Sequence, residues 1–141
     1  MRYLLDTNAI REPYRPTPSA VFMKRFTAHR AQTAISAVTW QELVSGASRL
    51  PKGKRRDGLE RYHELVRANF SILPFDEEAA SWAGREDARL AAKGIAMSCE
   101  DVQIASVAAV RGLTLVSADA AFSRFERLAV TDWAREGRAR R

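Results

Sequence analysis

Short apolar runs alternate with helical segments along most of this chain, and this alternation constrains the fold more than any other feature. The runs at 3–5, 33–36 and 113–117 predict short buried strands. Between them, apolar residues recur at helical spacing. Because buried strands connected by helices form a parallel sheet with both faces covered, the sequence predicts an α/β fold.

Capping residues and helix breakers set the expected element boundaries. Ser19, Asp76 and Ser98 are expected N-caps, and Gly46 is expected to end a helix. We expect helices at about 19–28, 38 or 39 to 45, 57–69, 76–93, 98–111 and 119–125, a basic loop at 49–56, an extended edge segment at 72–75 and a last strand at 129–131. Residues 1–134 are expected to form one domain, followed by a basic tail at 135–141.

Composition excludes several classes of protein. With 46% hydrophobic and 28% charged residues, the 141-residue chain is not a disordered one. No apolar run approaches the length needed to span a bilayer, and the N-terminus meets Asp6 after three apolar residues, too few for a signal peptide. The single cysteine, Cys99, excludes an internal disulfide and points to a reducing compartment. We therefore expect a soluble cytoplasmic protein.

The net charge of +6 comes from 23 basic against 17 acidic residues, and 19 of the basic residues are arginine. Because guanidinium groups pair well with phosphate, such a surface favours a nucleic-acid partner. The alternative is that the arginines reflect genome composition and aid solubility.

Four acids occupy positions that suggest chemistry. Asp6 directly follows the first predicted strand, and Asp119 comes two residues after the predicted strand at 113–117. Glu42 and Asp101 lie in the first turns of predicted helices. In parallel α/β sheets the ligand site lies beyond the carboxyl ends of the strands. These positions therefore predict that the four carboxylates meet at one edge of the sheet.

Each acid also has a purely structural explanation. Asp6 and Asp119 could cap the segments that follow them. Glu42 completes a capping box with Thr39, and Asp101 completes a similar pattern with Ser98. Taken together, however, four neighbouring carboxylates repel one another unless a cation neutralises them, and Mg²⁺ prefers oxygen ligands.

Other chemistries are disfavoured by the residues present. A zinc site is disfavoured because His29 and His63 lack ligand-like spacing; they are expected to be surface or helix residues. Cys99 has no evident base partner and is expected to be a buried small residue. The chain contains neither a phosphate-binding glycine loop nor a serine nucleophile elbow.

Four motifs resemble, in order and spacing, those of PIN-domain ribonucleases, and in particular VapC toxins of bacterial toxin–antitoxin pairs. They are Leu4-Leu5-Asp6-Thr7-Asn8, Ile35-Ser36-Ala37-Val38-Thr39-x-x-Glu42-Leu43, Gly94-x-x-Met97-x-x-x-Asp101-x-x-Ile104-Ala105 and Leu115-Val116-Ser117-x-Asp119-x-x-Phe122. A closing Leu128-x-Val130-x-x-Trp133 also resembles the usual VapC ending, so that the resemblance spans about residues 2–133.

The resemblance implies a three-layer α/β/α fold and an endoribonuclease that uses Mg²⁺ or Mn²⁺. The implied catalytic and metal-binding residues are Asp6, Glu42, Asp101 and Asp119. Asp6 and Asp101 are the firmest ligands, Asp119 is a ligand directly or through water, and Glu42 orients or deprotonates the water or binds a second metal. Residues expected to hydrogen-bond to these groups are Thr7, Asn8 and Ser117. Because the carboxylates repel RNA, basic residues must flank them, and the candidates are Arg11, Arg15, Lys52, Lys54, Arg55 and Arg56, although the charges of the 49–56 loop could simply be solvated.

The sequence departs from the family pattern in two places. Ala121 stands where many relatives carry a further acid, and Ser117 replaces a commoner threonine. Glu100 directly precedes Asp101, and because neighbouring helix residues point about 100° apart, we expect Glu100 to face away from the site.

We further expect a homodimer and a small DNA-binding antitoxin as partners. The reason is an apparent excess of apolar surface on two helices, at Phe22, Met23, Phe26, Tyr62 and Phe70. In relatives the antitoxin's tail crosses near these helices and sends an arginine toward the acids. The alternative is that these side chains fill the monomer's own core.

Three other functions remain open from sequence. A housekeeping RNA-processing or DNA nuclease would carry the same motifs. A non-catalytic RNA-binding or partner-binding domain would not need all four acids. A phosphoacceptor domain would need a lysine after a late strand, and none of the four lysines is so placed.

Overall fold

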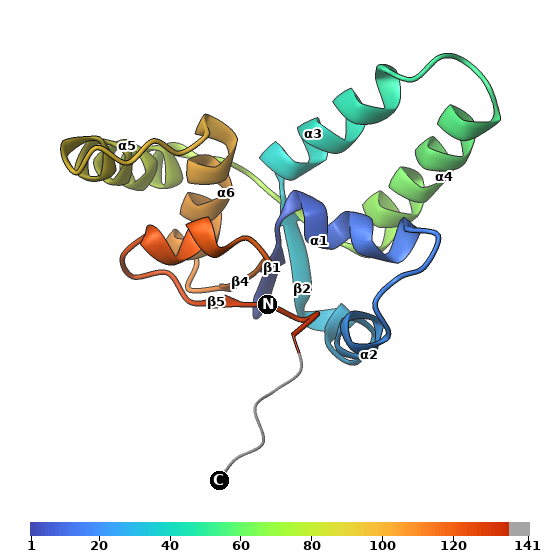
Figure 1. Cartoon of the computed structure of the whole chain (residues 1–141), viewed down its shortest axis with the longest axis horizontal. Helices are drawn as coiled ribbons and strands as arrows, with labels where there is room; N and C mark the ends of the chain where they lie inside the picture. Colours follow the sequence, from blue (N-terminus) through green and yellow to red (C-terminus); the bar gives the residue numbers. More distant parts are fainter. Residues whose placement is uncertain (136–141) are drawn as a thin grey trace, which may run out of the picture.

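Five parallel strands form one central sheet, in the order β3-β2-β1-β4-β5 (Figure 1). The computed structural model describes residues 1–135, so the expected basic tail lies outside the described residues apart from Arg135. The strands are β1 (Tyr3–Leu5), β2 (Thr33–Ser36), β3 (Ser71–Leu73), β4 (Thr114–Val116) and β5 (Val130–Thr131). The predicted parallel α/β fold is confirmed, and β3, before Pro74, is the expected edge segment.

Helices cover both faces of the sheet and give the three layers. They are α1 (Thr7–Arg11), α2 (Ala20–His29), α3 (Ala37–Ser48), α4 (Lys54–Asn69), α5 (Glu77–Ala92) and α6 (Cys99–Val110), with 3₁₀ turns η1 (Glu12–Tyr14), η2 (Arg30–Gln32) and η3 (Ala120–Arg124). No helix in the part of the chain that is described is long and apolar enough to cross a membrane.

The core is split in two by the sheet because successive strand side chains point to opposite faces. Leu4 and Leu115, paired in register, pack in one buried cluster with residues of α5 and α6. Leu5 and Val116 pack in a second cluster with residues of α1, α2, α3 and α4. All four side chains are at most 1% exposed. Burial of apolar side chains on both faces thus stabilises the parallel sheet. The polar residues lie in the loops at the ends of the strands.

Helix α3 begins and ends differently from the prediction. Ser36, the last residue of β2, is its N-cap, and the Ser36 hydroxyl accepts a hydrogen bond from the Thr39 N–H over 3.0 Å. The predicted capping box of Thr39 and Glu42 is therefore wrong, because a good N-cap residue already stands where the strand ends. The helix also continues through Gly46, where a Cβ atom would lie 3.4 Å from the Arg11 guanidinium.

Other local predictions also need correction. The short helix α1 follows β1 directly and was not expected, and α4 begins at Lys54, so that residues 54–56 belong to a helix rather than to the basic loop. Cys99 is exposed rather than buried, because it is the first residue of α6 at the open end of that helix. His63 lies in a helix as expected, but it is buried, at 5% exposure.

The aromatic residues that suggested a dimer surface pack inside this chain. Phe22 and Phe70 are buried in the second cluster, and Phe26 and Tyr62 pack against it. Phe26 lies between Phe22 and Phe70, with ring centroids 5.9 and 5.7 Å away. The apolar surface expected on these helices is therefore core, and it gives no support to a dimer.

Candidate active site at the carboxyl edge of the sheet

Asp6 follows β1, the central strand, and is held by both of its neighbours along the sheet edge. Its Oδ1 accepts a hydrogen bond from the Ala9 N–H over 2.8 Å as the N-cap of α1, and the Ser117 hydroxyl also bonds to the carboxylate. Asp6 is only 5% exposed. Burial raises the pKa of this carboxyl above its ordinary value and the charges of Asp101 and Asp119 add to the rise, while the two hydrogen bonds oppose it.

Glu42 lies one turn further into α3 than the predicted capping box implied, and it points to α1. The Thr7 hydroxyl donates a hydrogen bond to Glu42 Oε1 over 2.6 Å. The hydroxyl oxygens of Thr7 and Thr39 are 3.2 Å apart. Both threonines are buried. The buried Thr7 hydroxyl thus orients the Glu42 carboxylate through Oε1, and Oε2 remains available to accept a proton or bind a ligand.

Asp101 sits in the first turn of α6, whose N-cap is Ser98 as predicted. The Ser98 Oγ accepts a hydrogen bond from the Asp101 N–H over 3.1 Å. Burial raises the pKa of the Asp101 carboxyl, Ser98 lowers it, and the charges of Asp119, Glu42 and Glu100 raise it further. Asp101 therefore feels the charges of acids from two other segments and of its own neighbour in α6.

Asp119 follows β4 and caps η3, as its structural explanation predicted. Its Oδ1 accepts a hydrogen bond from the Ala121 N–H over 2.9 Å, and its own N–H donates to Ser117 Oγ over 3.0 Å. Ser117, which is buried, thus joins Asp119 to Asp6. Capping uses Oδ1 of Asp119 and leaves its Oδ2 available to a ligand.

The four predicted acids therefore converge, and we call them together the acid site. Asp6 and Asp101 each feel the charges of others in the set. Within residues 1–135, none of the four forms an ion pair with a basic side chain. Carboxylates gathered without a cationic partner are a donor set suited to a hard divalent cation.

The carboxylates of the acid site are too widely spaced to surround a metal ion on their own. Among the described residues, no three His, Cys, Asp or Glu side chains stand close enough to hold a metal ion by themselves. Mg²⁺ usually keeps several waters and binds through one or two carboxylates, so the donor set fits this ion with water completing its shell.

The remaining predicted residues lie around the acid site at different depths. Asn8 is exposed at the start of α1. Arg11 donates a long hydrogen bond, 3.5 Å, to the Glu42 carbonyl and lines a cavity of about 360 Å³ with Glu42 and Arg49. The side chains of the 52–55 segment are exposed, and Arg56 pairs with Glu60 over 2.6 Å.

Sequence reasoning missed two residues at this edge. Glu100 lines the same cavity as Glu42 and Arg11, although the helix period turned it away from Asp101. Asp132 follows β5 as Asp6 follows β1 and Asp119 follows β4. The strand at 129–131 was predicted, so the signal for Asp132 was its place directly after that strand.

These features define a class of α/β domain whose ligand site is acidic and lies at the carboxyl edge of parallel strands. The chain belongs to the PIN domain family, whose model matches residues 3–128.

Similar proteins and structures agree with this membership. The chain is 31% identical to the tRNA(fMet)-specific endonuclease VapC of Shigella flexneri, over 94% of this chain and 98% of that protein. It is 32% identical to Toxin FitB of Neisseria gonorrhoeae, over 82% of this chain and 86% of that protein. The solved structure of FitAB bound to a DNA fragment superposes with a TM-score of 0.87 at 28% identity and covers 98% of this chain and 99% of that one.

Proposed function

We propose that this protein is the toxin of a toxin–antitoxin pair and acts in the cytoplasm as a divalent-metal-dependent endoribonuclease. The observation that carries the proposal is the acid site, where carboxylates from four segments come together without a basic partner among the described residues and the neighbouring charges help to raise the pKa of Asp6 and of Asp101. Relatives of similar length are named as an endonuclease and a toxin, which supports the reaction and the biological role.

Asp6 and Asp101 are proposed to hold Mg²⁺ or Mn²⁺, with Asp119 binding directly or through water. A bound divalent cation lowers the pKa of a water ligand and offsets the negative charge that builds up on the phosphate. Glu42 Oε2 takes the proton of the attacking water, since Oε1 is occupied by the Thr7 hydroxyl. The water oxygen forms the new bond to phosphorus, one ester P–O bond breaks, and the leaving oxygen takes a proton from solvent.

Basic side chains are proposed to guide the RNA backbone past the acid site. Arg11 and Arg15 are exposed on either side of the α1–η1 turn, and Arg11 reaches the cavity beside Glu42. The exposed side chains of Lys52, Lys54 and Arg55, with the half-buried Arg56, extend this charge toward the tip of the α3–α4 pair. Cations placed beside the carboxylates offset their repulsion of phosphate.

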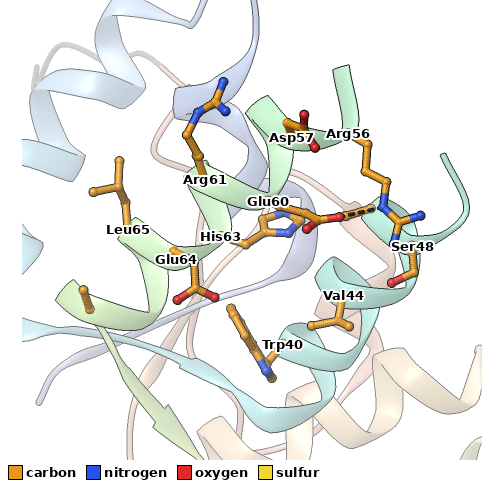
Figure 2. Close-up of a pocket in the computed structure, with 12 residues that line it drawn as sticks. Trp40, Val44, Ser48, Arg56, Asp57, Glu60, Arg61, His63, Glu64 and Leu65 are labelled. Carbon is orange, nitrogen blue, oxygen red and sulfur yellow. Dashed lines mark hydrogen bonds and ion pairs between the residues drawn. The ribbon is translucent and has the colours of Figure 1, made fainter. Parts of the chain in front are cut away.

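An antitoxin is proposed to occupy the groove between α3 and α4, a cavity of about 970 Å³ (Figure 2). Leu65 and Val44, at 62% and 43% exposure, are large apolar side chains left on its walls. The occupant is an apolar segment of a small DNA-binding protein, as in the resemblance to VapC pairs. An arginine sent from it to the acid site would pair with carboxylates where the metal is proposed to bind, which explains inhibition.

Leu65→Glu tests the antitoxin groove, and Glu78→Gln on α5 is the matched surface control. The groove variant is expected to weaken antitoxin binding in titration calorimetry and to leave RNA cleavage unchanged. Unchanged antitoxin affinity would place the partner elsewhere. A homodimer stays a prediction without support from the buried aromatics, and light scattering at tens of micromolar tests it.

Cleavage of RNA by the purified protein tests the enzyme itself. We expect cleavage with Mg²⁺, none with excess EDTA and none by Asp101→Asn, while Asp87→Asn on the exposed face of α5 cleaves as the wild type does. Cleavage in EDTA would show that the reaction needs no divalent metal. Cleavage by Asp101→Asn would show that the acid site is not the catalytic site. A housekeeping nuclease is distinguished by the absence of a neighbouring short gene for a DNA-binding antitoxin.

A further inference from the structure

A second cavity, of about 470 Å³, adjoins the Arg11–Glu42 cavity, and Arg11 lines both. It lies between the α1–η1 segment and the ends of β4 and β5. Ser117 and Asn8 line it, and Ser117 also bonds to Asp6 and accepts from the Asp119 N–H. The cavity therefore shares a wall with the acid site, and a molecule within it adjoins whatever the acid site cleaves.

The inner wall of this cavity is apolar and rigid. Phe22 and Val116 line it at 3% and 1% exposure, and Ala9 is buried beside them. These side chains belong to the second core cluster, so the wall does not depend on a flexible loop. Such a wall suits the face of a flat heterocycle better than a phosphate or a hydrated ion.

Two acids line the same cavity: Glu12, which is bonded to Arg15 and to the Ser19 N–H, and Asp132. Asp132 lines the cavity, and its Oδ1 accepts a hydrogen bond from the Ala134 N–H over 2.9 Å, so Oδ2 is the oxygen that remains to accept from a ligand. Within residues 1–135, Asp132 forms no ion pair. An unpaired carboxylate at the edge of a cavity is expected to serve a ligand that brings hydrogen-bond donors.

The backbone around Asp132 is clamped in place. Arg25 Nη1 donates to the carbonyl oxygens of Asp132 and Trp133, over 3.3 and 2.9 Å. The Trp133 ring is 3% exposed and packs edge-on against Tyr3, with centroids 5.1 Å apart. The position of the carboxylate is therefore set before any ligand binds, which is what selection between similar ligands requires.

Arg15 supplies the opposite charge at the rim. Its side chain is 65% exposed and pairs with Glu12 over 3.0 Å, and Glu12 in turn accepts from the Ser19 N–H over 3.0 Å. A nucleotide bound here would place its base against the apolar wall and its phosphate near a guanidinium held at the mouth.

We infer that this cavity binds the base of a nucleotide adjacent to the cleaved phosphodiester and that Asp132 selects a base carrying an exocyclic amino group over uracil. The inference rests on the proposed ribonuclease function and adds a base-recognition subsite to it. Adenine, cytosine and guanine each offer an amino donor to Oδ2. Uracil offers only a ring N–H flanked by two carbonyl oxygens, which a carboxylate repels.

The test uses a short single-stranded RNA that the purified full-length protein cleaves at one mapped site. Each of the two nucleotides flanking that site is replaced in turn by uracil, by cytosine or by an abasic residue, and kcat/KM is measured. At one of the two positions we expect an abasic residue to lower kcat/KM about tenfold, and cytosine to be preferred to uracil about tenfold.

Asp132→Asn supplies the specific readout, because an amide can donate to a uracil carbonyl. The cytosine-to-uracil ratio of kcat/KM is expected to fall toward one or to invert. Because both substrates are measured with the same enzyme preparation, this ratio does not depend on the fraction of the variant that is folded. Asp87→Asn, on the far helix α5, is the matched control and keeps the wild-type ratio. Ala134→Trp, which narrows the cavity from an exposed position, is expected to abolish the effect of the abasic residue.

Failure of this inference is distinct from failure of the enzyme. Cleavage that is indifferent to the base at both positions overturns the subsite and leaves the ribonuclease intact. If Asp132→Asn instead weakens antitoxin binding and leaves the base ratio unchanged, the cavity serves a protein segment and the inference is overturned. Absence of cleavage of any RNA overturns both proposals.

Discussion

The Thr7 hydroxyl donates a hydrogen bond to Glu42 Oε1 over 2.6 Å, and this bond joins α1 to α3 across the candidate active site. Thr7 immediately follows Asp6, so one turn of chain carries both a proposed metal ligand and the group that orients the proposed base. The relationship makes Thr7 a positioning residue whose effect is separable from RNA binding.

Thr7→Val should therefore slow cleavage with little change in affinity for RNA. Valine keeps the shape of the buried side chain and removes the donor to Glu42, so we expect kcat to fall about tenfold or more while KM changes less than twofold. Thr7→Ser restores the hydroxyl and is expected to recover most of the rate. Steady-state kinetics on one mapped RNA decides this, and an unchanged kcat for the valine variant would show that Glu42 needs no such orientation.

Neutralising an acid of the site should remove activity without loss of stability. The pKa of Asp101 is raised mainly by burial and then by neighbouring carboxylates. A raised pKa means that the ionised form is less favourable in the folded than in the unfolded protein, so this cost is present at neutral pH and disappears on acidification. Asp101→Asn is expected to melt at the same temperature as the metal-free wild type or up to about 5 °C higher.

Differential scanning fluorimetry in EDTA, followed by addition of Mg²⁺, tests this expectation. Mg²⁺ should raise the melting temperature of the wild type because it binds the folded state, and the variant should lose most of that rise. A large destabilisation of metal-free Asp101→Asn would mean that this carboxylate serves the fold rather than a ligand.

The four acids were predictable from strand ends and helix starts, whereas helix α1 and the true start of α3 were not. Asp6 and Asp119 were placed by the apolar strands before them, and the structure has both at the sheet edge. Helix α1 escaped prediction because five residues carry too little periodicity to distinguish a helix from a turn. The role of Thr39 was misassigned because the capping pattern at 39–42 begins one turn after the true N-cap, Ser36.

Tertiary packing explains the remaining errors. The exposure of Cys99 depends on where α6 sits relative to the sheet, which no local pattern contains. Similarly, whether Phe22 and Phe70 face solvent or core depends on the second cluster assembling from four helices and the segment around Trp133. An amphipathic helix pattern predicts that the apolar face is buried. It does not tell whether the face packs against the same chain or against a partner.

Arg11 should contribute to RNA affinity mainly through charge. In an Asp101→Asn background, which prevents cleavage, Arg11→Ala is expected to weaken binding of single-stranded RNA and to reduce the slope of log Kd against log salt by about 0.7. Arg85→Ala on α5, on the opposite side of the fold, is the matched control and should leave the slope unchanged. Fluorescence anisotropy across a salt series measures both, and equal slopes for the two variants would remove Arg11 from the RNA path.

The contribution of His63 to the stability of the protein should fall on mild acidification. The ring is 5% exposed, its Nε2 has no hydrogen-bond partner among the described residues, and it lies near Trp40 with centroids 6.4 Å apart. Burial lowers the pKa of His63 below its ordinary value of 6.5, Arg11 lowers it further, and Glu60 opposes the shift. The unfolded chain therefore takes up a proton at a higher pH than the folded protein does, so stability is lost as pH falls below 6.5.

His63→Leu removes this proton uptake and fills the same space without a buried polar atom. At pH 7.5 we expect the variant to be at least as stable as the wild type, because a buried unpaired nitrogen is removed. Between pH 7.5 and pH 5.5 the wild type should lose more stability than the variant, with a melting-temperature difference of roughly 2 to 4 °C for each kcal/mol involved. The melting temperatures of both proteins are measured across this pH range. Equal decreases for the two proteins would show that His63 becomes charged as readily in the folded state as in the unfolded chain, which contradicts the prediction.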